Sequence, residues 1–594
     1  MRRAGAGRTR RVLGALLVAV LGASGSCGLP ETGPVQQGLD IGSPLMPPVR
    51  FEFEAPPRGA TPEQIVRGFL AASWSMDDDF RAARAYLTPH ASRAWNPRSA
   101  VTVYPDSGSL QVVATGPTTM ALQTRQDAAL DSSGRYRSLP VGTTRESVLG
   151  LERASGEWRI SSIPPDFGLW ISRFYFERAY RLFSIAYADP RLHTIVADRR
   201  WLPVGAGLTT TLARALVEAP PAYLLGAVRS GFPAGTRLSV DSVPVEFGQA
   251  AVDLNPGVLD VSADERRAAW AQALTTIRQA PEVESVALQV AGRNLDVVVG
   301  GRTGTVPTTL EELGFGPSAP PVTKVLWRTA AGLTALDSGE LGRDDDSGRA
   351  QSPVLPAVGA QWQWVAASGD LADVAAISAD RRVLQRWRGQ ATGATPGIGG
   401  ALTPPSYDRA GRLWIGGSAA DGGSRIWLVD APRGLDARPR TLSAPWLDAV
   451  GREELLFVRP APDGQRMLVV SRRPSGVVLG VSGVLRDALG VPIGLTEPWP
   501  IGGDLREIAS AGWVSNTAVA VVGSRQRGET VVPMLVDVGG ATTPLAPVPG
   551  ARRVVPTGGE RGVLVVSADG HVYGRAGGGW QQLGDATDVV VPGY

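Results

Sequence analysis

Residues 562–570 read Gly-Val-Leu-Val-Val-Ser-Ala-Asp-Gly, and Val572 and Tyr573 continue the apolar pattern after the Asp-Gly pair. Two apolar runs joined by Asp-Gly predict a β-hairpin, because this pair accepts the positive φ angles of tight hairpin turns. Four earlier segments repeat the theme: 371–384, 406–415, 455–470 and 508–519. The C-terminal part of the chain is therefore predicted to consist of repeated hairpins.

The spacing of the turns predicts how these hairpins are arranged. Asp463, Asn516 and Asp569 recur every 53 residues, close to the length of one four-stranded propeller blade. Asp380 and Asp408 lie closer together, so the repeat is less regular at its start. We predict an all-β propeller of about five or six blades over residues 320–594. A β-sandwich is the alternative, and the regular spacing disfavours it.

Residues 189–305 are predicted to be an α/β domain. Strands are expected over residues 193–197 and 283–290, and helices over 209–219 and from Ser262 to Gln279. The order of these elements resembles the GerMN domain of sporulation and germination proteins, a small interaction module. The turns of that pattern fall at Pro233, Gly235, Thr236 and Gly292. The resemblance implies no chemistry for this domain.

The first folded unit is predicted over residues 61–188. Thr61, Pro62 and Gln64 form a helix-start signal with a capping box, and a second helix is expected from Asp77 to Leu87. Five strands are expected to follow, at residues 100–104, 110–114, 119–123, 146–149 and 157–160. Two helices followed by a curved antiparallel sheet resemble the cone-shaped cystatin-like α+β fold. Since no acid–His pair has a recognisable spacing, a scaffold role is preferred over a ligand pocket.

The N-terminus has the pattern of an export signal. Residues 1–26 combine five arginines and no acid with the apolar run 12–21, which is too short to span a membrane. Cys27 is the only cysteine, and the small residues before it resemble a bacterial lipobox. This resemblance implies an S-diacylglycerol cysteine, with N-palmitoylation as a further modification. Residues 27–60 are Pro- and Gly-rich and are predicted to be a tether, and no later apolar stretch is expected to enter the membrane.

Composition restricts the function further. The chain has 594 residues with 59 Lys and Arg against 56 Asp and Glu, and all but Lys324 of the basic residues are Arg. This Arg-for-Lys bias is typical of a GC-rich genome and does not indicate nucleic-acid binding. Without the five leader arginines the count becomes 54 basic against 56 acidic residues, so the mature protein is near neutral.

Few residues offer catalytic or metal chemistry. The histidines, His90, His193 and His571, fall one in each predicted unit, and with Cys27 assigned to the anchor no Cys/His zinc site or Cys nucleophile is expected. The acidic runs 77–79 and 344–346 are interpreted as a helix start and a solvated loop rather than metal sites. Six tryptophans of the propeller are expected to pack in its core, with a carbohydrate-stacking surface as the alternative: Trp362, Trp364, Trp387, Trp414, Trp427 and Trp513. We expect no cofactor, no metal and no enzymatic activity.

The whole arrangement resembles the LpqB family of actinobacterial lipoproteins. The most telling segments are Leu29-Pro30 after Cys27, Thr61-Pro-Glu63, Arg67-Gly-Phe-Leu70 and Tyr86-Leu-Thr-Pro89. The resemblance implies a lipid-anchored protein on the extracytoplasmic face of the cell membrane. It also implies an accessory role to the Mtr two-component system, through contact with the extracytoplasmic domain of the sensor kinase MtrB, and so in cell-wall homeostasis and division. The alternative is a propeller that binds or processes cell-wall carbohydrate, for which paired carboxylates in the central channel would be the sign.

Overall fold

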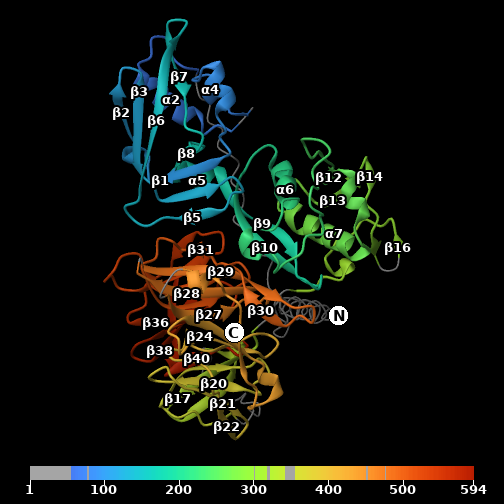
Figure 1. The fold of residues 1–594 in the computed structure, drawn as a ribbon, viewed down its shortest axis with the longest axis vertical. Coiled ribbons are helices and arrows are strands. Elements are labelled where there is room, and N and C mark those ends of the chain that lie inside the picture. The colour runs from blue at the N-terminus through green and yellow to red at the C-terminus, as the bar shows by residue number, and fades with distance from the viewer. Residues whose placement is uncertain are drawn as a thin grey trace, which may run out of the picture. The chain divides into compact units, whose positions relative to one another are not determined.

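The computed structural model describes residues 55–76, 79–299, 302–317, 322–341, 355–449, 453–474 and 476–593, drawn as a ribbon in Figure 1. All of them belong to one compact unit, residues 50–594. Cys27, the predicted signal peptide, most of the tether and the acidic residues 77, 78 and 344–346 lie outside the described residues.

The first helix of the N-terminal domain begins as predicted, but the second does not. In α2 (Pro62–Ala72) the Thr61 hydroxyl accepts the Gln64 N–H, and the Gln64 side chain accepts the Thr61 N–H at 2.8 Å. The helix predicted over 77–87 is wrong: only α3 (Arg81–Arg84) forms, after Phe80 in a left-handed conformation at φ 60°. Thr88 then caps a separate helix, α4 (Pro89–Ala94), so Thr-Pro here starts a helix instead of ending one.

The strands of this domain form two four-stranded sheets, β2-β3-β6-β7 and β5-β4-β1-β8. The prediction of a single antiparallel sheet is wrong in two ways: there are two sheets, and β1 pairs with β8 in parallel. Strand β8 is buried at every position, so it lacks the polar alternation that identifies a half-buried strand. The bounds are β1 (Ala100–Tyr104), β2 (Gln111–Gly116), β3 (Thr119–Arg125), β4 (Ala128–Asp131), β5 (Tyr136–Ser138), β6 (Thr144–Ala154), β7 (Glu157–Ser162), β8 (Leu169–Ser172) and α5 (Arg173–Ala179).

The second domain has the predicted α/β organisation of a GerMN domain. Its helix α7 (Ala263–Ile277) begins with a capping box between Ser262 and Glu265 and connects two parallel strands, β12 and β13. A long hairpin, β9–β10, precedes this unit. The other bounds are β9 (Tyr180–Ala188), β10 (Ile195–Pro203), α6 (Leu208–Leu216), β11 (Val245–Glu246), β12 (Gln249–Leu254), β13 (Ser285–Val290), β14 (Arg293–Asn294), β15 (Val298–Val299) and β16 (Arg302–Thr303).

The C-terminal region is built of β-sheets, as predicted, with one short helix, and its described residues form six sheets. Sheet 1 joins the two ends of the region, because β40 from the C-terminus pairs with β17. The strands of sheets 1 to 3 are β17 (Lys324–Thr329), β18 (Gly332–Asp337) and β40 (Asp588–Val590); β19 (Trp362–Ala367), β20 (Val374–Ser378), β21 (Leu384–Arg388) and β22 (Ala391–Ala394); and β23 (Ser406–Tyr407), β24 (Leu413–Ser418), β25 (Ser424–Val429) and β26 (Pro439–Thr441).

Sheets 4 to 6 continue in the same order along the chain. The short helix α8 lies between sheets 3 and 4. The strands of sheets 4 to 6 are β27 (Glu454–Pro460), β28 (Arg466–Arg473), β29 (Gly476–Arg486), β30 (Pro492–Leu495) and β31 (Trp499–Ile501); β32 (Glu507–Trp513), β33 (Ala518–Ser524), β34 (Val532–Asp537) and β35 (Thr542–Pro544); and β36 (Ala551–Gly558), β37 (Gly562–Ser567), β38 (His571–Ala576) and β39 (Gly579–Asp585), with α8 at Trp446–Ala449.

The six sheets close into a ring through their hydrophobic clusters. One cluster packs sheet 1 on sheet 2, further clusters continue through sheets 3, 4, 5 and 6, and the last packs sheet 6 back on sheet 1. Large clusters of this kind supply most of the stability of a propeller, since apolar burial contributes about 25 cal/mol per Å². We call these boundaries between neighbouring sheets the seams.

The hairpins are where the sequence predicts them, but the phase of the repeat is wrong. Asp463 and Asn516 lie in turns between the first and second strands of sheets 4 and 5, whereas Asp569 lies between the second and third strands of sheet 6. Both kinds of turn join antiparallel apolar strands, so their sequences look alike. The 53 residues from Asp463 to Asn516 therefore measure one sheet, whereas the equal interval from Asn516 to Asp569 does not.

Candidate functional site

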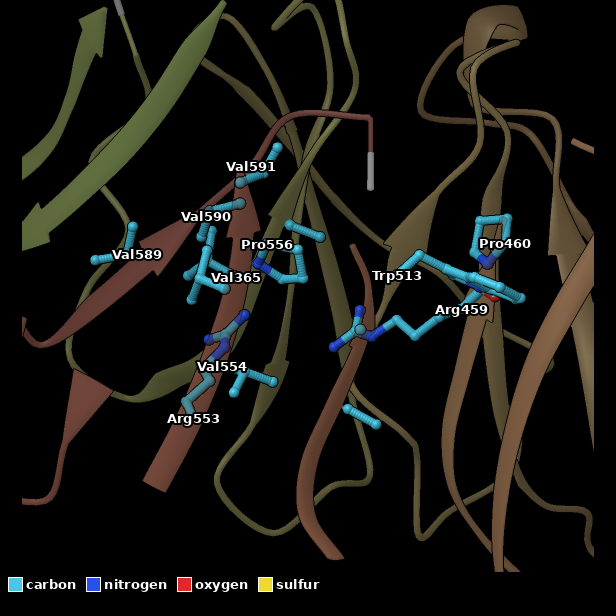
Figure 2. Close-up of a pocket in the computed structure, with 14 residues that line it drawn as sticks. Val365, Arg459, Pro460, Trp513, Arg553, Val554, Pro556, Val589, Val590 and Val591 are labelled. Atoms are coloured by element: carbon cyan, nitrogen blue, oxygen red, sulfur yellow. Dashed lines mark hydrogen bonds between the residues drawn. The ribbon is translucent and has the colours of Figure 1, made fainter. Parts of the chain in front are cut away.

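The edge strands of five sheets line one cavity, which is the central channel of the ring. Strands β19, β27, β32, β36 and β40 each lie at an edge of their sheet, and each contributes to the lining of a cavity of about 50 Å³. Most of the lining is apolar, including Val365, Trp513 and Val589. Two charged side chains, Arg459 and Arg553, interrupt it, and Figure 2 shows their guanidinium groups reaching toward each other across the channel.

Arg459 projects from β27 into this apolar environment. Its Nη1 donates to the Pro405 carbonyl at 2.7 Å, and its own carbonyl accepts the Trp513 indole N–H at 3.0 Å. Burial, and then repulsion from Arg553, lower the pKa of Arg459, against the opposing effect of Asp588. A guanidinium still keeps its charge at neutral pH. Among the described residues, no carboxylate forms an ion pair with it.

Arg553, on β36, is neutralised by the carboxylate of Asp588 at the start of β40, to which its Nη1 donates. Asp588 also acts on Arg328 of β17, because its charge opposes the lowering of the Arg328 pKa by burial. Arg328 Nη2 donates to the Gly359 carbonyl at 2.9 Å. Strand β40 therefore brings Asp588 into an ion pair with Arg553 and places it opposite Arg328 on the neighbouring strand.

A second, wider cavity of about 410 Å³ adjoins the channel, and we call it the vestibule. Arg553 lines both cavities, and Trp362, Trp364 and Arg328 line the vestibule. Trp364 has a left-handed backbone at φ 55°, in a β-bulge of β19. Bulges re-aim side chains near functional sites, and here the bulge places the Trp364 ring centroid 6.0 Å from the Arg553 guanidinium carbon.

The arrangement is suited to binding rather than to glycoside hydrolysis. The described residues that line the channel and the vestibule include four arginines (Arg328, Arg459, Arg552 and Arg553) and one carboxylate, Asp588. Glycoside hydrolysis ordinarily requires two carboxylic acids flanking the bond to be cleaved. The paired carboxylates that would have indicated such an enzyme are thus not found in these linings. Among the described residues, no cluster of His, Cys, Asp and Glu has the geometry of a metal site.

The predicted tryptophans divide between the core and the vestibule. Trp387, Trp414, Trp427 and Trp513 are buried in the seams, as expected for core residues. Trp362 and Trp364 are partly buried, pack against the hydrophobic clusters of two seams and also line the vestibule, so the core prediction holds for these two only in part. Alternation along β19 could not reveal this, because the bulge shifts the register after Gln363.

The histidines do not form a site. His90 and His193 are exposed, and His571 Nδ1 lies 2.7 Å from Asp585 Oδ1 on the neighbouring strand β39. Sequence reasoning also missed Arg459 and Arg553, which are 94 positions apart and meet only when the ring closes. In the sequence each is one arginine among many, so no signal could have selected them.

Three family models match the chain in succession. Residues 55–177 match the model described as "Lipoprotein LpqB, N-terminal domain", residues 181–296 match "Sporulation and spore germination", and residues 339–594 match "Lipoprotein LpqB beta-propeller domain". These matches follow the order of the three folded parts described above.

Curated relatives extend the similarity to the full chain. The protein named lipoprotein LpqB of Streptomyces coelicolor is 29% identical, over 100% of this chain and 99% of its own length. That of Thermobifida fusca is 25% identical, over 88% of this chain and 89% of its own.

Two solved structures are each similar to a part of the chain. The tandem GerMN domains of the sporulation protein GerM from Bacillus subtilis are 17% identical, with a TM-score of 0.19, over 27% of this chain and 59% of that one. A TolB-like structure from Agrobacterium tumefaciens is 16% identical, with a TM-score of 0.28, over 45% of this chain and 90% of that one.

Proposed function

The chain belongs to the LpqB lipoprotein family, and on this premise we propose that it is a lipid-anchored accessory protein of the sensor kinase MtrB. In this proposal Cys27 carries the diacylglyceryl anchor on the extracytoplasmic face of the membrane. The folded domains contact the extracytoplasmic domain of the kinase and thereby modulate signalling in cell-wall homeostasis and division. The observation that carries the proposal is the similarity over the whole chain to proteins named lipoprotein LpqB.

The GerMN domain and the propeller contact each other through polar and apolar groups. Arg199 of the GerMN domain pairs with Asp537 of sheet 5, at 3.2 Å. Trp201 Nε1 donates to the Gly539 carbonyl at 3.1 Å, and Arg466 Nη1 donates to the Ala197 carbonyl at 3.0 Å. One hydrophobic cluster also continues from the GerMN core into the seam between sheets 4 and 5.

An exposed hairpin of the GerMN domain is a specific candidate for the contact. Phe247 lies between β11 and β12 with 105% relative exposure, on a left-handed backbone at φ 49°. A fully exposed aromatic side chain is typical of interface anchors, and a bulky residue at positive φ is unusual. In a pull-down of the purified mature protein with the MtrB sensor domain, we expect capture by the wild type and weaker capture by Phe247→Asn.

The pull-down is decisive for the proposal as a whole. The matched control is Phe174→Asn, which replaces another exposed phenylalanine, on α5 of the N-terminal domain. No binding of the wild type at tens of micromolar would count against the kinase as the partner. Equal capture by both variants would remove the hairpin from the contact and leave the kinase proposal standing.

The proposed anchor is tested by membrane fractionation. No helix in the described part of the chain is long and apolar enough to cross a membrane. We expect Cys27→Ala to release the protein from membranes, while Ser26→Ala, which keeps a small residue beside the thiol, leaves it bound. Membrane retention of Cys27→Ala would contradict the lipid anchor.

Binding of cell-wall carbohydrate is a second candidate function, favoured by Trp362 and Trp364 in the vestibule. Aromatic rings at the mouth of a cavity can stack on sugar faces. Titration with soluble cell-wall oligosaccharides, monitored by tryptophan fluorescence, distinguishes this role. A change that disappears in Trp364→Ala would support it, and no change would exclude this surface as the site.

A further inference from the structure

The channel of the propeller holds more positive charge than the structure neutralises. Arg459 has no ion-pair partner among the described residues. Arg553 forms an ion pair with Asp588, and the negative charge of Asp588 also acts on Arg328. An isolated charge removed from water is unfavourable unless it is paired or hydrogen-bonded. Within the described residues, the Arg459 guanidinium donates one hydrogen bond, to the Pro405 carbonyl, so its other donors remain available to the channel.

The walls around these arginines are of a kind that strengthens an anion contact. Val365, Val554 and Val589 are apolar residues that line the cavity, and Figure 2 shows them on the Arg553 side of the channel. In such an environment the attraction between opposite charges is several times stronger than at an exposed surface. A guanidinium also presents paired N–H groups that match the two oxygens of a carboxylate or phosphate.

We propose that the propeller channel binds an oxyanion, a carboxylate or phosphate group, between Arg459 and Arg553. The group enters through the vestibule, whose volume of about 410 Å³ accommodates the remainder of the ligand beside Trp362 and Trp364. The channel itself, at about 50 Å³, admits only the small anionic end. A metal cation is disfavoured by the same charges, and a neutral sugar would leave them unpaired.

The position of Asp588 explains why the site can still accept an anion. Asp588 pairs with Arg553 from the β40 side and leaves Arg459, on the opposite wall, without a carboxylate. An incoming anion therefore completes the charge balance of the channel without displacing an existing ion pair.

The test is isothermal calorimetry on the full-length protein in detergent, with inorganic phosphate and acetate as separate probes at constant ionic strength. We expect at least one probe to bind at millimolar or lower concentration, with binding at least tenfold weaker in Arg459→Met. Arg438→Met is the matched control, because it removes the same charge from an exposed residue that lines neither cavity. It should bind as the wild type does.

The two probes also identify the ligand chemistry. Tighter binding of phosphate assigns a phosphorylated ligand, and tighter binding of acetate assigns a carboxylate. The proposal is overturned if neither probe binds at 10 mM to the wild type (a concentration about tenfold above the weakest expected affinity), or if Arg459→Met binds with unchanged affinity. Thermal unfolding of each variant without the probe verifies that a loss of binding is not a loss of folding.

Discussion

The seams of the propeller and its channel both hold arginines, but they differ in burial and in how the positive charge is neutralised: Arg386 and Arg466 of the seams are fully buried, and Arg459 of the channel is partly buried. In the seam between sheets 2 and 3, Arg386 donates to Asp373 through Nε at 3.1 Å and Nη2 at 2.7 Å. In the seam between sheets 4 and 5, Arg466 lies 2.6 Å from Asp463. Arg459 of the channel has no such partner among the described residues. The charge of each paired arginine is neutralised within the fold, whereas Arg459 contacts the Pro405 carbonyl and the Phe457 ring but no carboxylate among the described residues.

The seam between sheets 2 and 3 should show the largest effect of losing an arginine. Arg386→Met strands Asp373, which is 3% exposed and also accepts the Tyr407 hydroxyl. Removing one partner of a buried ion pair costs about 4 kcal/mol, and we expect a loss of this size in the free energy of unfolding measured with urea. The double variant Arg386→Met/Asp373→Asn should be more stable than the single one. If it is not, the stranded charge is not the cause.

A tryptophan pair extends the comparison from charge to packing. Trp387 is buried in the seam between sheets 1 and 2, and Trp364 lines the vestibule. We expect Trp387→Ala to lower the free energy of unfolding by about 3 kcal/mol, because it leaves a cavity in a close-packed cluster. Trp364→Ala should lower it by less than half as much. Equal losses in denaturant unfolding would mean that the vestibule tryptophan is a core residue after all.

The paired arginine at the GerMN junction should have a smaller effect on stability but a local signature. Arg466→Met leaves Asp463 without its guanidinium, although backbone N–H groups of Gln465 and Arg466 still donate to that carboxylate. We therefore expect a loss of about 2 kcal/mol. Hydrogen exchange should accelerate in β10, since Arg466 also donates to the Ala197 carbonyl.

Arg466→Lys is the control for that junction, because it keeps the charge but loses the planar pair of donors. Its loss should be intermediate between the wild type and Arg466→Met. Unchanged exchange over residues 195–203 in both variants would show that the GerMN domain does not depend on this contact.

The sequence reveals features of this molecule that are decided locally. The capping box at Thr61 forms as predicted, and the one observed at Ser262, where a helix start is predicted, likewise joins residues three positions apart. Hairpins such as β37–β38 are also local, since each is specified by two apolar runs and a turn. The failed helix at 77–87 shows the limit: Thr88-Pro89 is an equally good start signal, and the chain uses it for α4.

The channel could not be predicted, because ring closure creates it. The pairing of β40 with β17 joins residues more than 250 positions apart, and it brings Asp588 to Arg553. The turn sequences do not reveal which strand of a sheet is innermost. Asn516 lies between the first and second strands of its sheet, whereas Asp569 lies between the second and third strands of the next sheet. Without that phase, no reasoning from spacing could have placed Arg459 on a channel wall.

The smallest effect on stability is expected at the residue with the largest proposed role. Arg459→Met strands no carboxylate and removes a charge from an apolar environment, at the loss of one hydrogen bond to Pro405. These effects oppose each other, so the free energy of unfolding without added anion should change by less than about 1 kcal/mol. A loss above about 2 kcal/mol in urea unfolding would make Arg459 a structural residue like Arg386. The distinction between seam and channel would then fail. A near-zero change together with lost anion binding would mean that the ring retains this charge for its ligand and not for its fold.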